Sequence, residues 1–172
     1  MKTRVIVTLC VVFVWGLVSF ANAQVVAGSP EDKAFQKIDS ENNPDSKINM
    51  LLAFEKDFPQ SKALREAYLQ LVELYQAKNN SPKVIEYSEK VLKMDPNNLA
   101  ALLKATYALS LDGKNASLDR AIQYGQKAMD EITKMKSGPP QQGYTDDQWK
   151  QYINDNEALA KNYLSYAKSL RR

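Results

Sequence analysis

Recurring stop signals divide residues 30–170 into segments of helical length. Proline, glycine and paired asparagines interrupt helices, because proline lacks an amide donor and glycine and asparagine tolerate turns. The stop signals are Asn42-Asn43-Pro44, Pro59, Asn79-Asn80, Asp95-Pro96, Gly113 and Ser137-Gly138-Pro139-Pro140. Between them, apolar residues recur at spacings of three and four, and no stretch alternates for long enough to predict a strand. The pattern predicts an all-α fold with short connections.

Start signals support the same division. Ser29-Pro30-Glu31-Asp32 combines a capping hydroxyl, a proline at the first helical position and acids in the first turn. Thr145-Asp146-Asp147-Gln148 has the pattern of a capping box and predicts a terminal helix over 145–170. We expect Asp45 or Ser46 to cap the second helix and Ser61 to open the third.

The first 23 residues have the pattern of a secretory signal peptide. Lys2 and Arg4 precede an apolar run over residues 5–20, and Ala21-Asn22-Ala23 supplies the small residues of a cleavage site before Gln24. The alternative is an uncleaved membrane anchor, but the run is shorter than the roughly 20 residues that cross a bilayer. We therefore expect an exported protein, periplasmic or secreted and of bacterial type, with no stable membrane span after cleavage. Residues 24–29 would form a flexible leader.

Composition argues against an enzyme. Histidine is absent, and the single cysteine, Cys10, lies within the predicted signal. The mature chain would therefore lack the usual zinc ligands, a thiol nucleophile and the residue most used for acid–base catalysis near neutral pH. We predict no catalytic residue, no metal and no cofactor.

The charge distribution argues against nucleic-acid binding. Removal of Lys2 and Arg4 leaves 21 basic residues against 20 acidic ones, a mature net charge of about +1. Apart from Arg171-Arg172, basic residues alternate with acids along the chain. Nucleic-acid binding requires a dense basic surface that displaces counterions.

Residues 61–98 resemble one tetratricopeptide repeat. The matching positions are Tyr68, Leu71-Val72, Tyr75, Val84, Val91 and the closing Pro96. The segment departs from the family pattern by Val72 in place of glycine, valines in place of two alanines, and Ser88 in place of an aromatic residue. Residues 99–137 resemble a second, poorer copy through Leu102, Ala105-Thr106, Leu109, Ala121 and Ala128, with an insertion at 114–119 that we expect to lengthen a turn.

A degenerate copy precedes these two, and Leu159-Ala160-x2-Tyr163 matches the repeat core again in the terminal helix. The terminal helix is expected to begin a further repeat or to cap the array. The resemblance implies that residues 30–172 form antiparallel helix pairs stacked as a short right-handed solenoid.

The resemblance also implies a concave groove, lined by the first helix of each pair, that receives a protein or peptide partner. The candidate groove residues are Glu66, Leu69, Glu73, Gln76, Leu103, Lys104, Tyr107 and Ser110. Two alternatives stay open for them: Leu69, Leu103 and Tyr107 would pack against the preceding helix, and Glu66 and Glu73 would form a solvated face.

These observations predict an exported protein–protein interaction scaffold or adaptor, with a role in envelope assembly as a narrower form. Phe58-Pro59-x-Ser61 resembles joints found in repeat proteins of the bacterial envelope. The alternatives are a carrier of small ligands and a hydrolase that uses carboxylates. The sequence does not identify the partner, the oligomeric state or whether the groove or the end helices bind.

Overall fold

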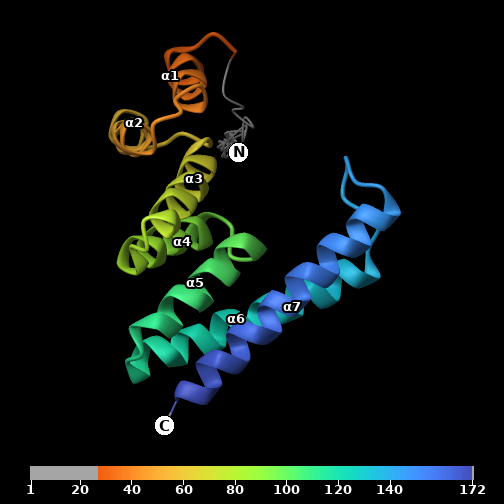
Figure 1. Cartoon of the computed structure of the whole chain (residues 1–172). Helices are drawn as coiled ribbons and strands as arrows, with labels where there is room; N and C mark the ends of the chain where they lie inside the picture. The colour runs from red at the N-terminus through yellow and green to blue at the C-terminus, as the bar shows by residue number, and fades with distance from the viewer. Residues whose placement is uncertain (1–26, 172) are drawn as a thin grey trace, which may run out of the picture.

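The computed structural model describes residues 27–171, and this part of the chain consists of seven α-helices without a strand (Figure 1). The helices are α1 (Pro30–Asp39), α2 (Pro44–Asp57), α3 (Leu64–Ala77), α4 (Ser81–Met94), α5 (Leu99–Asp112), α6 (Asn115–Ser137) and α7 (Asp146–Leu170). The all-α prediction is confirmed for these residues. The predicted signal at 1–23 and its cleavage site between Ala23 and Gln24 lie outside the described residues, as does part of the leader.

Helix starts follow the local sequence signals with two corrections. The Ser29 hydroxyl accepts from the Asp32 amide, and Thr145 and Gln148 form a complete capping box at α7. The cap of α2 is Asn43, not Asp45 or Ser46: its side-chain oxygen accepts from the amides of both those residues at 3.0 Å. Pro44 favours the first helical position, so the residue before it becomes the cap. Ser61 does not open α3: the helix begins at Leu64 after Ala63, which makes no side-chain cap, and the Ser61 hydroxyl accepts from the Ala63 amide at 2.9 Å in the preceding turn.

The insertion at 114–119 lengthens a helix and not a turn, which corrects the expectation. Only Gly113 and Lys114 connect α5 to α6, and Gly113 ends α5 in the left-handed conformation at φ 68°. The additional residues continue as helix, so that α6 has 23 residues where α5 has 14. Glycine takes this conformation without a Cβ penalty, and a two-residue connection is therefore sufficient.

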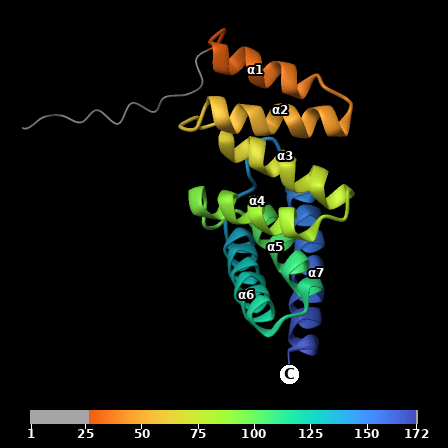
Figure 2. The ribbon, with the colours of Figure 1, turned by 90° about the vertical axis from the view of Figure 1, so that its left-hand side faces the viewer.

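Each helix packs against the next along the chain, and α5 is the most enclosed because it contacts α3, α4, α6 and α7. Figure 2 shows α1, α2, α3 and α4 as successive layers, with α6 and α7 running crosswise to them. The most deeply buried large side chains come from α1, α2, α3, α5 and α6: Ile38, Leu51, Phe54, Leu71, Leu102, Leu109, Leu118 and Ile132. One continuous core therefore runs through the described chain.

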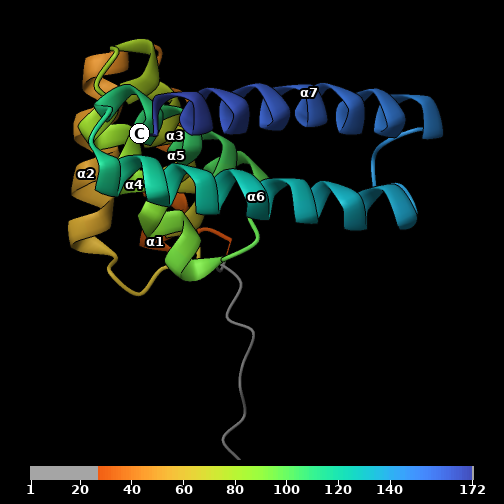
Figure 3. The same cartoon turned by 90° about the horizontal axis from the view of Figure 1, so that it is seen from below.

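The pair α6 and α7 extends beyond the other helices. The two run side by side, joined by the loop at 138–145, and their joined end projects away from α1–α5 (Figures 1 and 3). With 23 and 25 residues, they are longer than α5, which covers only part of their length. The exposed surface of α7 is consequently large.

Candidate partner-binding groove

A groove lies between α3 and α7, with α5 as its floor. Both α3 and α7 pack against α5, and within the described chain they make no close backbone contact with each other. A hollow of about 370 Å³ lies at one end, with lining residues that include Leu69 from α3, Ala100 from α5 and Tyr152 from α7. A smaller hollow of about 110 Å³ lies between α3, the start of α4 and α5, lined by Gln76, Tyr107 and Leu111 among others. Neither hollow is enclosed.

The α3 wall carries four of the residues expected from the sequence. Glu66, Leu69, Glu73 and Gln76 share one face of the helix because of their spacing of three and four. Both glutamates are exposed, whereas Leu69 and Gln76 are half-buried and each lines one of the two hollows. The amide oxygen of Gln76 is buried and has no hydrogen-bond partner among the described residues.

The α5 floor differs from the sequence expectation. Lys104 pairs with Glu73 on α3 at 2.9 Å, and the Tyr107 ring lies 4.9 Å from that of Tyr163 on α7. Leu103 and Ser110, however, are only 4% and 1% exposed. These two side chains do not face solvent, because α5 is packed against helices on several sides.

A stripe of exposed apolar side chains on α7 forms the second wall, and the sequence interpretation missed it. Leu159, Tyr166 and Leu170 are 41%, 43% and 37% exposed. With about 100° of rotation per residue, these three and Tyr152 lie within roughly 40° of one another. Tyr163 lies beside them and packs on Tyr107, which places the stripe at the α5 edge of α7. We call these four residues the α7 stripe.

In the sequence, the spacing of seven, seven and four residues between these apolar residues of α7 is the pattern that could have predicted the stripe. By residue type, however, Leu159 and Tyr163 match the repeat core motif, which predicts that they are buried. The residues that face the core are Trp149, Ile153, Ala160, Leu164 and Ala167. The face that a helix buries depends on its neighbours, and motif matching does not reveal it.

The outer face of α7 is polar. It lies about 140° around the helix from the α7 stripe. Its exposed residues are Lys150, Asn154, Ala158, Lys161, Ser165 and Lys168. The lysines of this helix are thus concentrated away from the groove. The charged residue nearest to the α7 stripe is Asp155.

Acidic side chains predominate along the groove. Glu73 pairs with Lys104, and Asp95 and Glu131 at the larger hollow pair with Arg65 at 3.8 Å and Lys134 at 2.7 Å. Two further carboxylates, of Glu66 on α3 and Asp155 on α7, have no ion pair with any described residue. The groove therefore combines exposed apolar side chains with two carboxylates that have no ion pair among the described residues.

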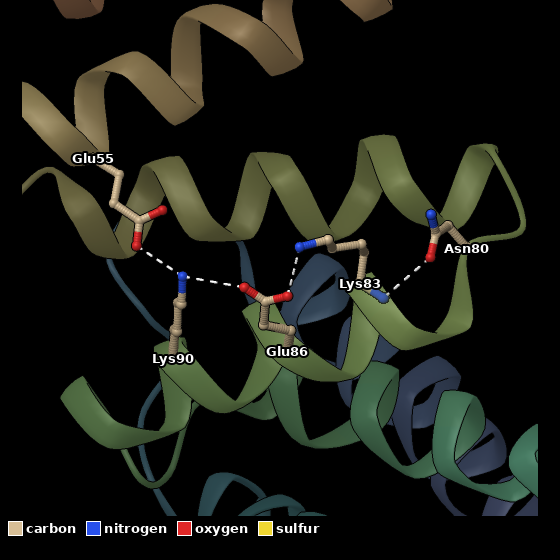
Figure 4. Close-up of polar contacts among 5 residues, drawn as sticks. All are labelled: Glu55, Asn80, Lys83, Glu86 and Lys90. Atoms are coloured by element: carbon tan, nitrogen blue, oxygen red, sulfur yellow. Dashed lines mark hydrogen bonds and ion pairs between the residues drawn. The ribbon is translucent and has the colours of Figure 1, made fainter.

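A polar cluster on the α2 and α4 side holds the α3–α4 pair in place. Lys90 on α4 lies 2.8 Å from Glu55 on α2 and 3.3 Å from Glu86, which also pairs with Lys83 at 2.7 Å (Figure 4). The figure also shows Asn80 accepting from the Lys83 amide, which caps α4. The Lys90 ammonium lies over the rings of Tyr68 and Tyr87 as well. We interpret the cluster as a structural tie between neighbouring helices.

The cluster shifts the acidity of the tyrosines it encloses. Burial raises the pKa of Tyr68 to about 12, and the hydrogen bond that its hydroxyl donates to Glu55 at 2.9 Å adds to this. Burial, together with Glu55 and Glu86, raises the pKa of Tyr87 to about 12 as well. Burial lowers the pKa of Lys90, but the two carboxylates outweigh it and leave that pKa above its ordinary value. At neutral pH both tyrosines are therefore uncharged.

Compared with known proteins, the chain matches no family model, no curated protein and no solved structure. Among the described residues, no helix is both long and apolar enough to cross a membrane.

Proposed function

We propose that the chain is an exported protein–protein interaction scaffold that holds a segment of a partner in the groove between α3 and α7. The observation that carries this proposal is the α7 stripe, which leaves Leu159, Tyr166 and Leu170 exposed. On the same helix, Tyr163 packs on Tyr107 and Tyr152 lines a hollow with Leu69. Isolated exposed apolar residues are ordinary, but a contiguous apolar surface with a polar rim is typical of partner contacts.

Recurring contacts support a TPR-like solenoid as the architecture. Gln70 on α3 donates to Asp39 on α1, and Lys104 on α5 donates to Glu73 on α3. Each member of the second pair lies 34 positions after its counterpart in the first, and 34 residues is the length of a tetratricopeptide repeat.

The even-numbered helices contact one another in the same way. Lys90 on α4 donates to Glu55 on α2, and Tyr124 on α6 donates to Glu89 on α4, again with a displacement of 34 positions. Contacts that recur at a fixed interval between alternate helices are expected when identical helix pairs stack.

The surface of α7 supports a role as the capping helix of the array. Stacked repeats need a terminal element with a polar outer face, since the last repeat has no neighbour to cover it. Lys150, Asn154, Lys161 and Lys168 supply such a face. Of the two expectations for this helix, the geometry favours the cap over the start of a further repeat.

The alternatives receive less support. A carboxylate hydrolase would need two acids facing each other across neighbouring helices. Glu73 is paired with Lys104, and the unpaired Glu66 and Asp155 lie on α3 and α7, which make no close backbone contact with each other. A small-ligand carrier would favour a closed apolar cavity, whereas the groove hollows are open. We therefore propose a binding function without catalysis, and a protein rather than a nucleic acid as the partner.

Site-specific photo-crosslinking in the native compartment tests the proposal. A photoreactive amino acid at Leu159 should form a discrete adduct with a partner protein, identified by mass spectrometry. The matched control is Ala158, an exposed neighbour on the outer face of the same helix. Equal adducts from both positions, or none from Leu159, would refute groove binding. Leu103 is unsuitable for this test because its side chain is buried.

Export is tested separately. The chain recovered from the producing cell should begin at Gln24 by N-terminal sequencing and should fractionate with the periplasm or medium. A chain that keeps residues 1–23 and sediments with membranes would favour the anchor interpretation.

A further inference from the structure

The shape of the α7 stripe restricts what can lie against it. From Tyr152 to Leu170 the stripe runs straight along the helix for about 27 Å, at about 1.5 Å per residue. Its spacing of seven, seven and four residues is that of an apolar seam between two helices. A helical segment with the same spacing would place an apolar row against this one.

An extended segment would find few partners in the groove. Its walls and floor are helices, whose backbone amide and carbonyl groups are already hydrogen-bonded within each helix. Binding of an extended strand relies on main-chain hydrogen bonds, whereas a helix satisfies its own backbone and needs side-chain contacts alone. The groove geometry therefore favours a helix.

The charges favour a cationic occupant. Glu66 on α3 and Asp155 on α7 have no ion pair with the described residues, and Glu73 is 62% exposed on its side chain even while paired with Lys104. Lys150, Lys161 and Lys168 lie on the outer face of α7 and would not repel a cation in the groove. An anionic occupant would meet uncompensated carboxylates from both walls.

A buried acceptor gives an independent indication. Gln76 lines the smaller hollow. Its amide oxygen is buried and receives no hydrogen bond from any described residue. Buried polar atoms are rarely left unpaired, and a donor on the occupant would satisfy this acceptor. Lysine and arginine side chains carry several donors and no acceptor.

We propose that the occupant of the groove is a cationic amphipathic α-helix whose apolar row lies on the α7 stripe and whose basic flanks face Glu66 and Asp155. This inference rests on the proposed function and names the class of partner for the same groove. A second copy of this chain and an extended or acidic segment are the competing occupants.

Three synthetic peptides of equal length test the inference on the full mature chain. The first is a leucine–lysine helix with apolar residues at heptad spacing, the second carries glutamate in place of lysine, and the third has the first peptide's composition in an order without an apolar stripe. Fluorescence anisotropy should show the first binding at least about tenfold more tightly than either of the others, with an affinity that decreases as salt is added.

Matched variants locate the binding surface. Leu159→Lys and Tyr166→Lys should each weaken binding of the leucine–lysine peptide by about tenfold or more, because each removes an apolar contact and adds a like charge. Ala158→Lys and Ser165→Lys add the same charge on the outer face and should change affinity less than about twofold. Glu66→Lys should weaken binding as well, whereas Asp130→Lys on α6 should not. Circular dichroism confirms that each variant is folded.

Each result supports or overturns the inference. Equal affinity for the lysine and glutamate peptides would overturn the cationic occupant, and equal affinity for the scrambled peptide would overturn the helix. A second copy of the chain would be the occupant if the chain self-associates, if Leu159→Lys abolishes that association, and if no peptide binds. If no peptide binds but Leu159 still crosslinks to a partner in the native compartment, the scaffold proposal stands and the helical occupant is wrong. If no peptide binds and Leu159 forms no crosslink, both proposals are refuted.

Discussion

The ammonium group of Lys104 on α5 lies 2.9 Å from the carboxylate of Glu73 on α3 and ties the groove floor to one wall. The glutamate side chain is 62% exposed, so water and salt weaken this pair. We expect Lys104→Met to lower the free energy of unfolding by less than about 1 kcal/mol, and the loss to shrink at high salt. Urea denaturation at two salt concentrations measures it. A loss that is large and insensitive to salt would contradict this account.

Gly125 allows three helices to approach closely. A Cβ at this position of α6 would lie 3.2 Å from side-chain atoms of both Leu164 on α7 and Thr106 on α5. We expect Gly125→Leu to lower the free energy of unfolding by about 1–3 kcal/mol through overpacking. In Gly125→Ala, the gain in helix propensity of about 1 kcal/mol should offset much of the strain. Thermal or urea unfolding of the two variants tests this, and equal stability would show that the contact relaxes freely.

Ser88 is fully buried on α4. Its hydroxyl has no hydrogen-bond partner in the described residues, so the desolvation of that group is not compensated. We expect Ser88→Ala to raise the free energy of unfolding by about 1 kcal/mol. The control is Ser110→Ala, because the Ser110 hydroxyl donates to the Thr106 carbonyl at 2.7 Å and its loss should not stabilise. Destabilisation by Ser88→Ala would indicate a partner such as an ordered water.

Tyr68 should make stability decrease at alkaline pH. Its pKa is about 12 in the folded chain, chiefly through burial, against about 10 for an unperturbed tyrosine. The folded state therefore retains a proton that the unfolded state loses, so the contribution of Tyr68 is complete below pH 10 and is lost between pH 10 and 12. Over this range, the free energy of unfolding of the native chain should fall relative to that of Tyr68→Phe. Urea denaturation with tyrosinate absorbance tests it, and a constant difference would contradict the shift.

Local signals were sufficient for the helices. Ser29 with Pro30, Gly113, and the capping box at Thr145 act within a few residues of their own position, so their effect can be read without knowledge of distant contacts. Three local expectations were wrong. At α3 the Ser61 side chain bonds within the turn before the helix, and the cap of α2 and the connection before α6 were misjudged where neighbouring signals competed. Asn43 stands before Pro44 and displaced the expected caps, and the tight turn at Gly113 let the insertion continue as helix.

The groove could be predicted only in part. On α3, Leu69 and Gln76 line hollows as their helical spacing suggests. On α5, Leu103 and Ser110 share the equivalent face by sequence but are buried in the packed chain. Which residues of equivalent faces remain exposed depends on the neighbouring helices, and the sequence of one helix does not contain that information.

The sequence by itself determined that the described chain is helical and where most of its helices begin and end. Capping, proline geometry and helical periodicity are local properties, and their energies act between residues close in the chain. Only the tertiary structure decided that α7 covers one edge of α5 and leaves Leu159, Tyr166 and Leu170 exposed. Burial is a property of neighbours distant in sequence, so an apolar residue becomes core or surface only when the helices have packed.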